Sequence, residues 1–319
     1  MRVDTHLPTD RPVEAGELAG AAEAAGFDGL WTAETSHDPF LPLAFASAAT
    51  ARVELGTAVA IAFARSPTVL AQTAWDLAAL SKGRFVLGLG TQVKAHVERR
   101  FAMPWGPPVA RLREYVGLVR AIWTSWQEGE RLNFRGQHYT ATLMTPFFSP
   151  APLEHRRPPI YLAAVAPPLL RLAGEVADGL AVHPLHTRSY LSEVIRPCVA
   201  EGARRGGRAA GDCALSVPVF AITGRDADER AQTREQVRAQ IAFYASTRSY
   251  VPVLAHHGWS ELHGELSALA SRQRWNEMAR LVPDEVLREV AVDAEPAELG
   301  AAVRARYAGL ADRVTLSRR

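Results

Sequence analysis

Residues 53–67 read Val-Glu-Leu-Gly-Thr-Ala-Val-Ala-Ile-Ala-Phe-Ala-Arg-Ser-Pro, and residues 83–92 read Gly-Arg-Phe-Val-Leu-Gly-Leu-Gly-Thr-Gln. Each begins with a short apolar run, as expected for a strand buried on both faces of a parallel sheet. Between them, Ser66-Pro67 predicts a helix start, and Gly83 lies where a left-handed C-cap belongs. Strand, crossover helix and strand make a right-handed βαβ unit. Both strands end in small or hydroxyl residues, so their backbone could approach a ligand.

Length and composition limit the function classes. The 319 residues suit one α/β barrel, and a hydrophobic fraction of 48% supplies a large core. A net charge of +2 is too near neutral to favour nucleic acid or a membrane surface as a partner. Cys198 and Cys213 predict no disulfide framework. Because we find no signal peptide and no apolar run of membrane-spanning length, we expect a cytoplasmic protein that acts on a small molecule.

The rest of the chain repeats one phrase, a helical pattern followed by a small or acidic turn and a short apolar strand. Eight strands alternating with helices predict a (β/α)8 barrel over residues 1–319, with a doubly wound sheet as the alternative. Two segments near 131–158 and 247–295 are too long for ordinary barrel loops. In the first, 132–140 predicts a hairpin; in the second we expect two or three short helices. The predicted strands are Val3–His6, Gly29–Ala33, Val53–Ala60, Arg84–Gly90, Pro159–Ala164, Gly179–His183, Ala214–Ile222 and Arg313–Leu316.

Candidate site residues follow the strand ends, because the functional face of such a barrel is the carboxyl end of its strands. Residues 163–168 (Ala-Ala-Val-Ala-Pro-Pro) could form a phosphate seat at a helix N-terminus, or be an ordinary helix start. Gly88-Leu89-Gly90 opens like a dinucleotide fingerprint, but the third glycine is replaced by Val93, which disfavours a Rossmann site.

Two polar groups of residues have competing interpretations. Asp4, His6 and His183 could surround one barrel mouth as metal ligands, although isolated histidines are more often structural. The loop 34–40 (Glu-Thr-Ser-His-Asp-Pro-Phe) gathers polar side chains after the second strand, and Asp38 could also cap the next helix.

Several motifs, taken in order, resemble the luciferase-like monooxygenase superfamily, and more narrowly its branch of coenzyme F420-dependent oxidoreductases. The similarity covers most of the chain. The motifs are Gly26-Phe27-Asp28-Gly29-Leu30-Trp31, Leu55-Gly56-Thr57-Ala58-Val59, Arg65-Ser66-Pro67, Gly83-Arg84-Phe85-Val86-Leu87-Gly88-Leu89-Gly90-Thr91, Arg111-Leu112-Arg113-Glu114-Tyr115, Gly136-Gln137-His138-Tyr139 and Ala177-Asp178-Gly179.

The resemblance implies a bacterial luciferase-like barrel, usually dimeric, that holds a flavin-like ring at the strand ends. It implies a bulge with a cis peptide at Ala58–Val59. Departures include Glu34-Thr35 in place of Asp-His, and Val93 where sugar-phosphate dehydrogenating members carry a glutamate. A sugar phosphate is therefore not the expected substrate. The implied cofactor contacts are Ala58, Val59, Ile61, Thr91, Gln92, His96, Val165, Ala166, Pro168 and Leu169.

We therefore expect an oxidoreductase that transfers hydride between coenzyme F420 and an organic substrate, because such cofactors do the redox chemistry while the protein orients them. The candidate acid–base residues are His37, Glu34 and His6. The alternatives are an FMN-dependent monooxygenase on the same fold, a metal-dependent barrel hydrolase, and a flavin-binding barrel without turnover. Lys94, Arg99 and Arg100 favour F420 over FMN, because the F420 tail carries additional carboxylates, but a solvated helix face also accounts for them.

Overall fold

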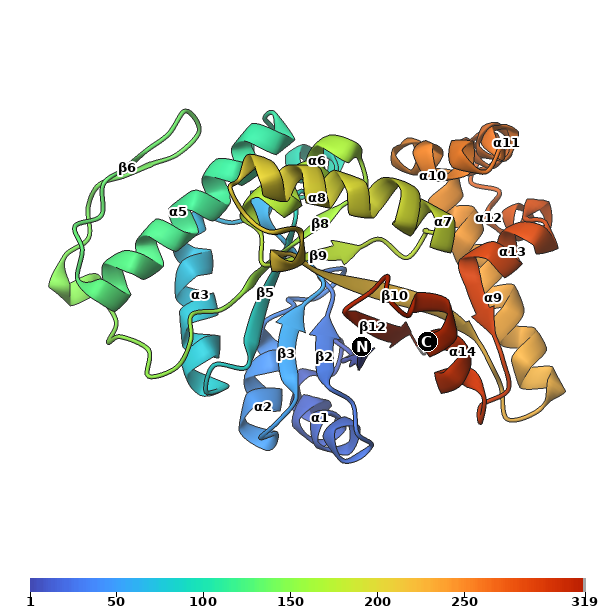
Figure 1. Cartoon of the computed structure of the whole chain (residues 1–319), viewed down its shortest axis with the longest axis horizontal. Coiled ribbons are helices and arrows are strands. Elements are labelled where there is room, and N and C mark those ends of the chain that lie inside the picture. Colours follow the sequence, from blue (N-terminus) through green and yellow to red (C-terminus); the bar gives the residue numbers. More distant parts are fainter. Residues whose placement is uncertain (318–319) are drawn as a thin grey trace.

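The computed structural model describes residues 1–317, and within them eight parallel strands close into a barrel (Figure 1). The last barrel strand pairs with the first, with Arg313 opposite Arg2. This pairing confirms the predicted (β/α)8 barrel and shows that the doubly wound alternative is wrong. In order of pairing the strands are β1 (Arg2–His6), β2 (Gly29–Thr32), β3 (Glu54–Thr57), β5 (Phe85–Gly90), β8 (Ile160–Ala164), β9 (Gly179–Val182), β10 (Ala214–Ile222) and β12 (Arg313–Ser317).

Helices cover the outside of this barrel. Helix α3 starts at Pro67 as predicted, although the Ser66 hydroxyl caps no N–H there. Gly83 adopts the predicted left-handed conformation after it, with φ +78°. The sequence pattern does not predict α14, which precedes the last strand. The outer helices are α1 (Ala15–Ala24), α2 (Leu41–Ala49), α3 (Pro67–Leu80), α5 (Pro108–Glu128), α6 (Pro167–Val176), α8 (Arg196–Arg205) and α14 (Leu299–Tyr307).

The recurring acidic turn ahead of a strand has a structural role. In each of three such turns, the aspartate carboxylate accepts a backbone N–H near the start of the neighbouring strand. These bonds fix the positions of adjacent strands at the bottom of the barrel, because they satisfy donors that the ladder leaves open. They join Asp28 to Val3 (2.8 Å), Asp178 to Ile160 (2.8 Å) and Asp312 to Leu215 (2.7 Å).

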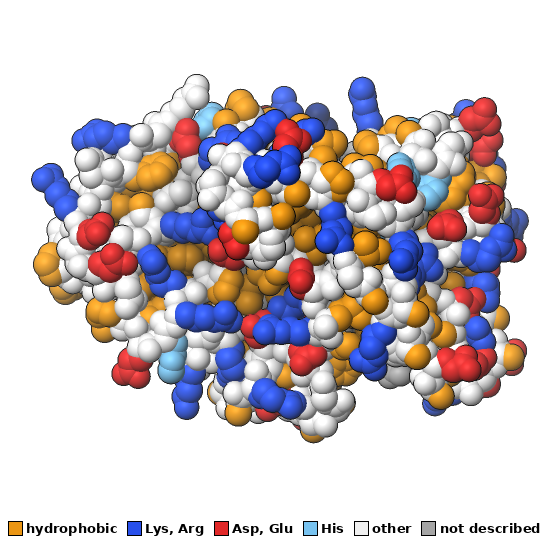
Figure 2. Space-filling model, viewed as in Figure 1, with side chains coloured by type: hydrophobic (Ala, Val, Ile, Leu, Met, Phe, Trp, Pro, Cys, Tyr) orange, Lys and Arg blue, Asp and Glu red, His pale blue; other side chains and the backbone are white. Residues whose placement is uncertain are grey.

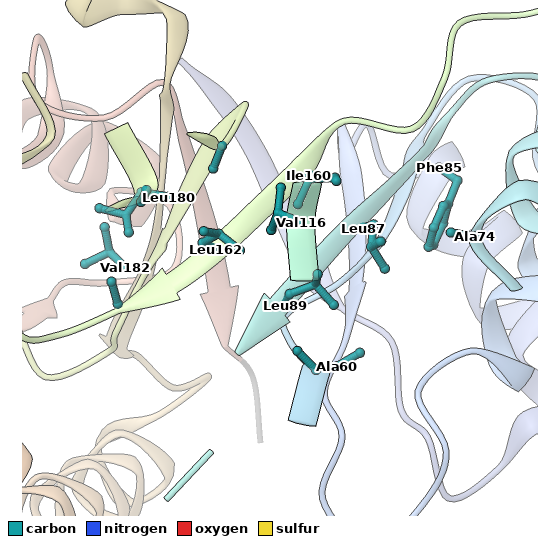
Figure 3. Packing of buried hydrophobic residues seen from close by; sticks show 14 of the residues in the cluster. Ala60, Ala74, Phe85, Leu87, Leu89, Val116, Ile160, Leu162, Leu180 and Val182 are labelled. Carbon is teal, nitrogen blue, oxygen red and sulfur yellow. The ribbon is translucent and has the colours of Figure 1, made fainter. Parts of the chain in front are cut away.

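The main hydrophobic core lies between the barrel and the helices around it. Figure 3 shows side chains of neighbouring strands pointing to this layer, including Leu87 and Leu89 of β5 and Leu162 of β8. Val116 of α5 packs against them, and all four are at most 1% exposed. Burying each such aliphatic side chain contributes about 1.5–3 kcal/mol, which outweighs helix propensity as the source of stability.

An ion pair fills the barrel interior beneath the mouth. Arg313 on β12 contacts Asp4 on β1 through two nitrogens, at 2.6 and 3.0 Å, and both side chains are at most 3% exposed. Trp31 on β2 donates its indole N–H to the same carboxylate at 2.9 Å, and the Arg313 guanidinium lies 4.7 Å from the Trp31 ring centre. The Asp4 carboxylate, which accepts from both partners, is therefore fully satisfied without exposure to solvent.

The third strand is interrupted where it reaches the mouth. Gly56 pairs with Val86 of β5, and pairing resumes at Ala60 with Leu89, so four residue steps on one strand face three on the other. This is the predicted one-residue bulge. The peptide bond Ala58–Val59 within it is cis, as the resemblance implies. The single predicted strand Val53–Ala60 is therefore wrong in its length: it divides into β3 and β4 (Ala60–Ile61).

Thr57 replaces the missing backbone ladder at this bulge. Its hydroxyl donates to the Gly88 carbonyl at 2.7 Å and accepts the Gly88 N–H at 3.0 Å. The approach is so close that a Cβ on Gly88 would lie 1.8 Å from the Thr57 carbonyl oxygen, and a Cβ on Gly90 would lie 2.8 Å from Val59. Gly88 and Gly90 therefore make room for the bulge. This packing role explains the Gly88-Leu89-Gly90 pattern, which resembles only the first part of a dinucleotide-binding fingerprint.

The first insertion forms the predicted hairpin, β6 (Phe134–Arg135) with β7 (Thr140–Ala141). Two motifs of the resemblance meet here, because Glu114 of α5 accepts three backbone N–H groups from residues 137–139. Burial opposes ionisation of this carboxylate, but the three N–H bonds outweigh it and lower its pKa. Arg111 donates to the Tyr139 hydroxyl at 2.8 Å. Both motifs therefore anchor the hairpin to α5.

The second insertion is more regular than predicted and carries its own hydrophobic cluster. Figure 1 places it at the opposite end of the molecule from the hairpin. Leu185, Phe220 and Ile241 belong to this cluster, which links the ends of β9 and β10 to the insertion. Beyond α9 (Ala227–Ala245), the insertion contains α10 (Val251–His256), α11 (Ser260–Ser271), α12 (Trp275–Met278), α13 (Asp284–Val290) and an unpredicted strand, β11 (Ala291–Asp293), which pairs with β10.

On the face shown in Figure 2, positive and negative side chains are interspersed. Among the residues the structure describes, no helix is both long and apolar enough to cross a membrane.

We expect Gly88→Ala to destabilise the protein strongly, because the new methyl group would collide with the Thr57 carbonyl. Overpacking of this kind typically costs about 1–3 kcal/mol, and a backbone clash belongs at the upper end. Gly264→Ala in α11 is the matched control, since a Cβ there meets nothing within 4 Å and alanine favours the helix. Urea unfolding of both variants measures the difference; equal stabilities would show that the bulge does not need a glycine on β5.

Candidate functional site

The carboxyl ends of the eight barrel strands gather the predicted site residues at one mouth. Because all eight strands are parallel, the segments that follow β2, β3, β5, β8 and β9 open at the same end of the barrel. The mouth therefore brings together the loops that begin at Ala33, Ala58, Thr91, Val165 and His183.

Arg65, which the sequence motifs give no role in the site, holds two of these loops together. Arg65, which follows the bulge, contacts Glu34 at 2.5 Å and Asp38 at 3.3 Å, both from the loop after β2. The Glu34 carboxylate also accepts the Ile61 N–H at 2.7 Å. Burial lowers the pKa of Arg65, but the two carboxylates outweigh this effect and raise it. Arg65 and Glu34 thus clamp the loop after β2 to the bulge of the third strand.

The clamp shows which of the three acid–base candidates are available to a substrate and which are already bonded within the protein. The Glu34 side chain is 7% exposed and is already bonded to Arg65 and to the Ile61 N–H. Its role is therefore to hold the loop rather than to contact a substrate. His37 is exposed, and neither Glu34 nor Asp38 contacts its ring in the part of the chain described. Neither carboxylate therefore orients the His37 ring. His6 ends β1 and is partly buried.

Asp38 does the capping that its position predicts. One carboxylate oxygen accepts the N–H groups of Phe40 at 2.8 Å and Leu41 at 3.2 Å, immediately before and at the start of α2. Such capping typically contributes about 1 kcal/mol. The other oxygen contacts Arg65, so the loop is rigid around an exposed His37.

The predicted ring-side segment exposes backbone and small side chains. Ala58 and Val59 are partly exposed in the bulge, where the backbone leaves the ladder. Ile61 is 3% exposed and its N–H is taken by Glu34, so it holds this segment in place. A flat, apolar ring fits such a surface, because small side chains leave room for it and neither Ala58 nor Val59 carries a charge.

Thr91 and Gln92 follow β5 on the adjacent side of the mouth and are partly exposed. Gln92 has φ +58°, a left-handed conformation that is uncommon for a residue other than glycine. Its side-chain oxygen accepts the Val93 N–H at 2.9 Å, ahead of the short helix α4 (Lys94–Arg99). His96 lies exposed on that helix. The geometry turns the chain sharply away from the mouth after the strand ends.

Two of the three basic residues considered for the cofactor tail, Arg100 and Lys94, have partners of their own. Arg100 donates to the Thr35 carbonyl, which ties the end of α4 to the loop after β2. Lys94 lies 3.9 Å from Glu98, and both are exposed. Arg100 therefore has a structural role besides the cofactor-tail contact considered for it.

The proposed phosphate corner offers fewer donors than an ordinary helix start. Helix α6 begins at Pro167-Pro168, and proline carries no N–H. The Leu169 N–H donates to the Ala166 carbonyl at 3.0 Å. The donors that suit an anion here are the N–H groups of Val165, which is partly exposed, and of Ala166, which is exposed. An anion fits this corner through these two groups and the positive end of the helix.

Asp4, one of the three residues considered as metal ligands, is not available to bind a metal. The Asp4 carboxylate is fully buried and is held by Arg313 and Trp31, away from any open position. His183 accepts the Leu185 N–H on Nδ1 at 3.1 Å and stacks on Tyr250. In the described ranges, no three His, Cys, Asp or Glu residues are grouped as a metal site.

Three of the matches with known proteins describe the family of this chain and its relatives. Residues 1–313 match the profile of the family described as luciferase-like monooxygenase. An uncharacterized protein of Mycobacterium tuberculosis is 45% identical over 314 residues, which cover 98% of this chain and 92% of the relative. A putative coenzyme F420-dependent oxidoreductase of the same organism is 31% identical over 299 residues, covering 88% of this chain and 84% of the relative.

Among solved structures, the coenzyme F420-dependent tetrahydromethanopterin reductase from Methanopyrus kandleri has a similar fold. Its TM-score is 0.80 at 20% sequence identity, and the alignment covers 99% of this chain and 93% of that one. At this level of identity the likeness concerns the fold alone.

Proposed function

Because the chain belongs to the luciferase-like monooxygenase family, we propose that it is an oxidoreductase that uses coenzyme F420 to transfer hydride to or from a small organic substrate. The relative named as a putative F420-dependent oxidoreductase, 31% identical over 299 residues, supports this choice of cofactor. We also propose that residues 1–319 form a single barrel domain with the two insertions described above.

The observation that carries the proposal is the bulge after β3. It presents the small residues Ala58 and Val59 at the mouth, and Thr57, Gly88 and the Glu34–Arg65 clamp hold it in place. A rigid, apolar and nearly flat surface is what binding of a flavin-like ring needs. Val165 and Ala166 would then hold the phosphate, and Thr91, Gln92, His96, Pro168 and Leu169 would complete the pocket. When bound, the deazaflavin supplies the ring carbon that gives or takes the hydride.

Titration of the purified protein with F420 and with FMN tests this proposal, and we expect tighter binding of F420. Ala166→Glu should weaken binding at least tenfold, because it puts a negative charge into the position proposed for a phosphate. Ala301→Glu on α14 is the matched control, since Ala301 is exposed and far along the chain from the mouth loops.

Preferential FMN binding would instead favour a monooxygenase on the same fold. Unchanged affinity of Ala166→Glu for both cofactors would show that the phosphate lies elsewhere.

For proton transfer we propose His37. An imidazole titrates near neutral pH, and this one is exposed on a loop fixed by Asp38 and Arg65. His37→Ala should lower turnover by about 10²–10⁴ with F420 affinity and stability unchanged.

Glu34→Gln should instead reduce stability. We expect it to lower the free energy of unfolding by about 1–3 kcal/mol, because Arg65 loses its charged partner. Turnover with a panel of carbonyl compounds and activated alkenes, together with urea unfolding, separates the two roles. Normal turnover of His37→Ala would remove His37 from the mechanism and leave His6 as the candidate.

We further propose that the protein is a homodimer, as the resemblance implies. Leu41 and Phe45 lie one turn apart on α2 and are 60% and 47% exposed, which gives that helix an apolar outer face. Phe45→Glu should therefore yield monomers, because burying a carboxylate in an interface is unfavourable. Sedimentation velocity checks this expectation; a wild-type mass of one chain, 34.7 kDa, would contradict it.

A further inference from the structure

His183 occupies a place at the mouth that the proposed mechanism does not use. It follows β9 directly, and its ring stacks on Tyr250 with centres 4.1 Å apart and an interplanar angle of 25°. Tyr244 of α9 meets the same ring edge-on at 4.6 Å. The sequence predicts for His183 only a possible role as a metal ligand, and no periodic signal marks Tyr250, which lies in the second insertion.

The hydrogen-bond pattern fixes the tautomer of His183. Its Nδ1 accepts the Leu185 N–H at 3.1 Å, so a neutral ring must carry its proton on Nε2. Burial, with a smaller contribution from the adjacent His186, lowers the pKa of His183 to about 3. Because this pKa is depressed, the ring is neutral at every pH well above 3. At neutral pH, His183 is therefore a neutral hydrogen-bond donor that does not change its protonation state.

Both rings present a polar atom that has no protein partner. Within residues 1–317, no hydrogen bond involves the His183 Nε2 or the Tyr250 hydroxyl, and neither is among the fully buried unsatisfied atoms. Both atoms therefore remain accessible. Burial raises the pKa of Tyr250 to about 12, with Tyr244 adding to the effect, so this hydroxyl also stays protonated.

The loop that carries His183 is held at several points, so the donors are fixed before any ligand arrives. Leu185 is buried in the second hydrophobic cluster. His186 contacts the His183 carbonyl at 2.9 Å and the Tyr307 hydroxyl at 3.1 Å. Thr187 contacts His257 of the second insertion at 2.7 Å. Such preorganised donors stabilise charge that develops on an oxygen without first having to reorient.

We propose that His183 Nε2–H and the Tyr250 hydroxyl form a two-donor site for an uncharged oxygen of the substrate, either a carbonyl or a hydroxyl group. This inference rests on the proposed function and extends it to the substrate class. The neighbouring groups that act on the two rings are His186 and Tyr244. Burial lowers the pKa of His186 to about 4, so its ring is neutral at neutral pH, and a tyrosine carries no positive charge. A carboxylate or phosphate would lack a counter-charge there, whereas a ketone, aldehyde or alcohol needs only hydrogen bonds. The aromatic faces of Tyr250 and Tyr244 suit an apolar body attached to that oxygen.

The test follows the His183 ring nitrogens by NMR in protein labelled with ¹⁵N-histidine and free of cofactor. We expect a protonated Nε2 and an unprotonated Nδ1 from pH 5 to pH 8. Cyclohexanone, acetophenone and benzaldehyde should shift the Nε2 resonance, and methylcyclohexane and toluene should not. An Nδ1-protonated ring, or no shift with any of the three carbonyl probes, would overturn the proposal.

Variants that keep an aromatic ring but lose a donor distinguish the effect of hydrogen bonding from the effect of ring shape. His183→Phe and Tyr250→Phe keep aromatic rings and remove one donor each, so each should weaken binding of the carbonyl probes about 3- to 10-fold. Tyr190→Phe is the control, because the Tyr190 hydroxyl is buried and without a partner in the described chain, so its loss should change nothing. Equal probe affinity in all three variants would exclude the donor pair.

Titration with F420 keeps the two proposals distinguishable. All three variants should bind F420 like the wild type. If none of the proteins binds F420 while the carbonyl shifts persist, the proposed cofactor fails and the donor pair stands. If F420 binds and the carbonyl probes have no effect, the donor pair fails and the proposed function stands.

Discussion

The contact between Thr57 and Gly88 is the constraint on which the proposed site depends. The hydroxyl of Thr57 replaces two ladder bonds, and only a strand without a side chain at position 88 can come that close. Where the third strand is interrupted, the Glu34 carboxylate accepts the Ile61 N–H. The Arg65 guanidinium in turn balances the negative charge of Glu34. A packing constraint on a single glycine thus leads to a fixed surface at the barrel mouth.

Sequence patterns predict the architecture well because the barrel is built from local signals. Apolar runs, capping residues and the acidic turns at Asp28, Asp178 and Asp312 each act within a few residues or between neighbouring strands. Resemblance to a family predicts the position of the bulge, and the structure confirms it. β11 and α14 escape prediction because the strand is short and the helix has no capping side chain or strong apolar face.

The site is less predictable than the fold because its contacts join distant parts of the chain. Arg65 and Glu34 are separated by 31 residues, and no spacing rule connects them. His183 reads as a possible ligand in the sequence, and only its stacking on Tyr250 and its bond from Leu185 show that it is a neutral donor. The two histidines at the barrel mouth, His37 and His183, therefore suit different chemical roles. His37 is exposed on its loop, and proton transfer is proposed for it, whereas His183 is held in one tautomer and suits a fixed hydrogen bond.

The central claim is that the bulge and the α6 corner together hold a deazaflavin. A crystal structure of the protein with bound F420 tests it most directly. We expect ring density against Ala58 and Val59, phosphate density at the N–H groups of Val165 and Ala166, and no change in the Glu34–Arg65 contact. Ring density anywhere outside this mouth, or a phosphate held by other residues with the α6 corner empty, would contradict it.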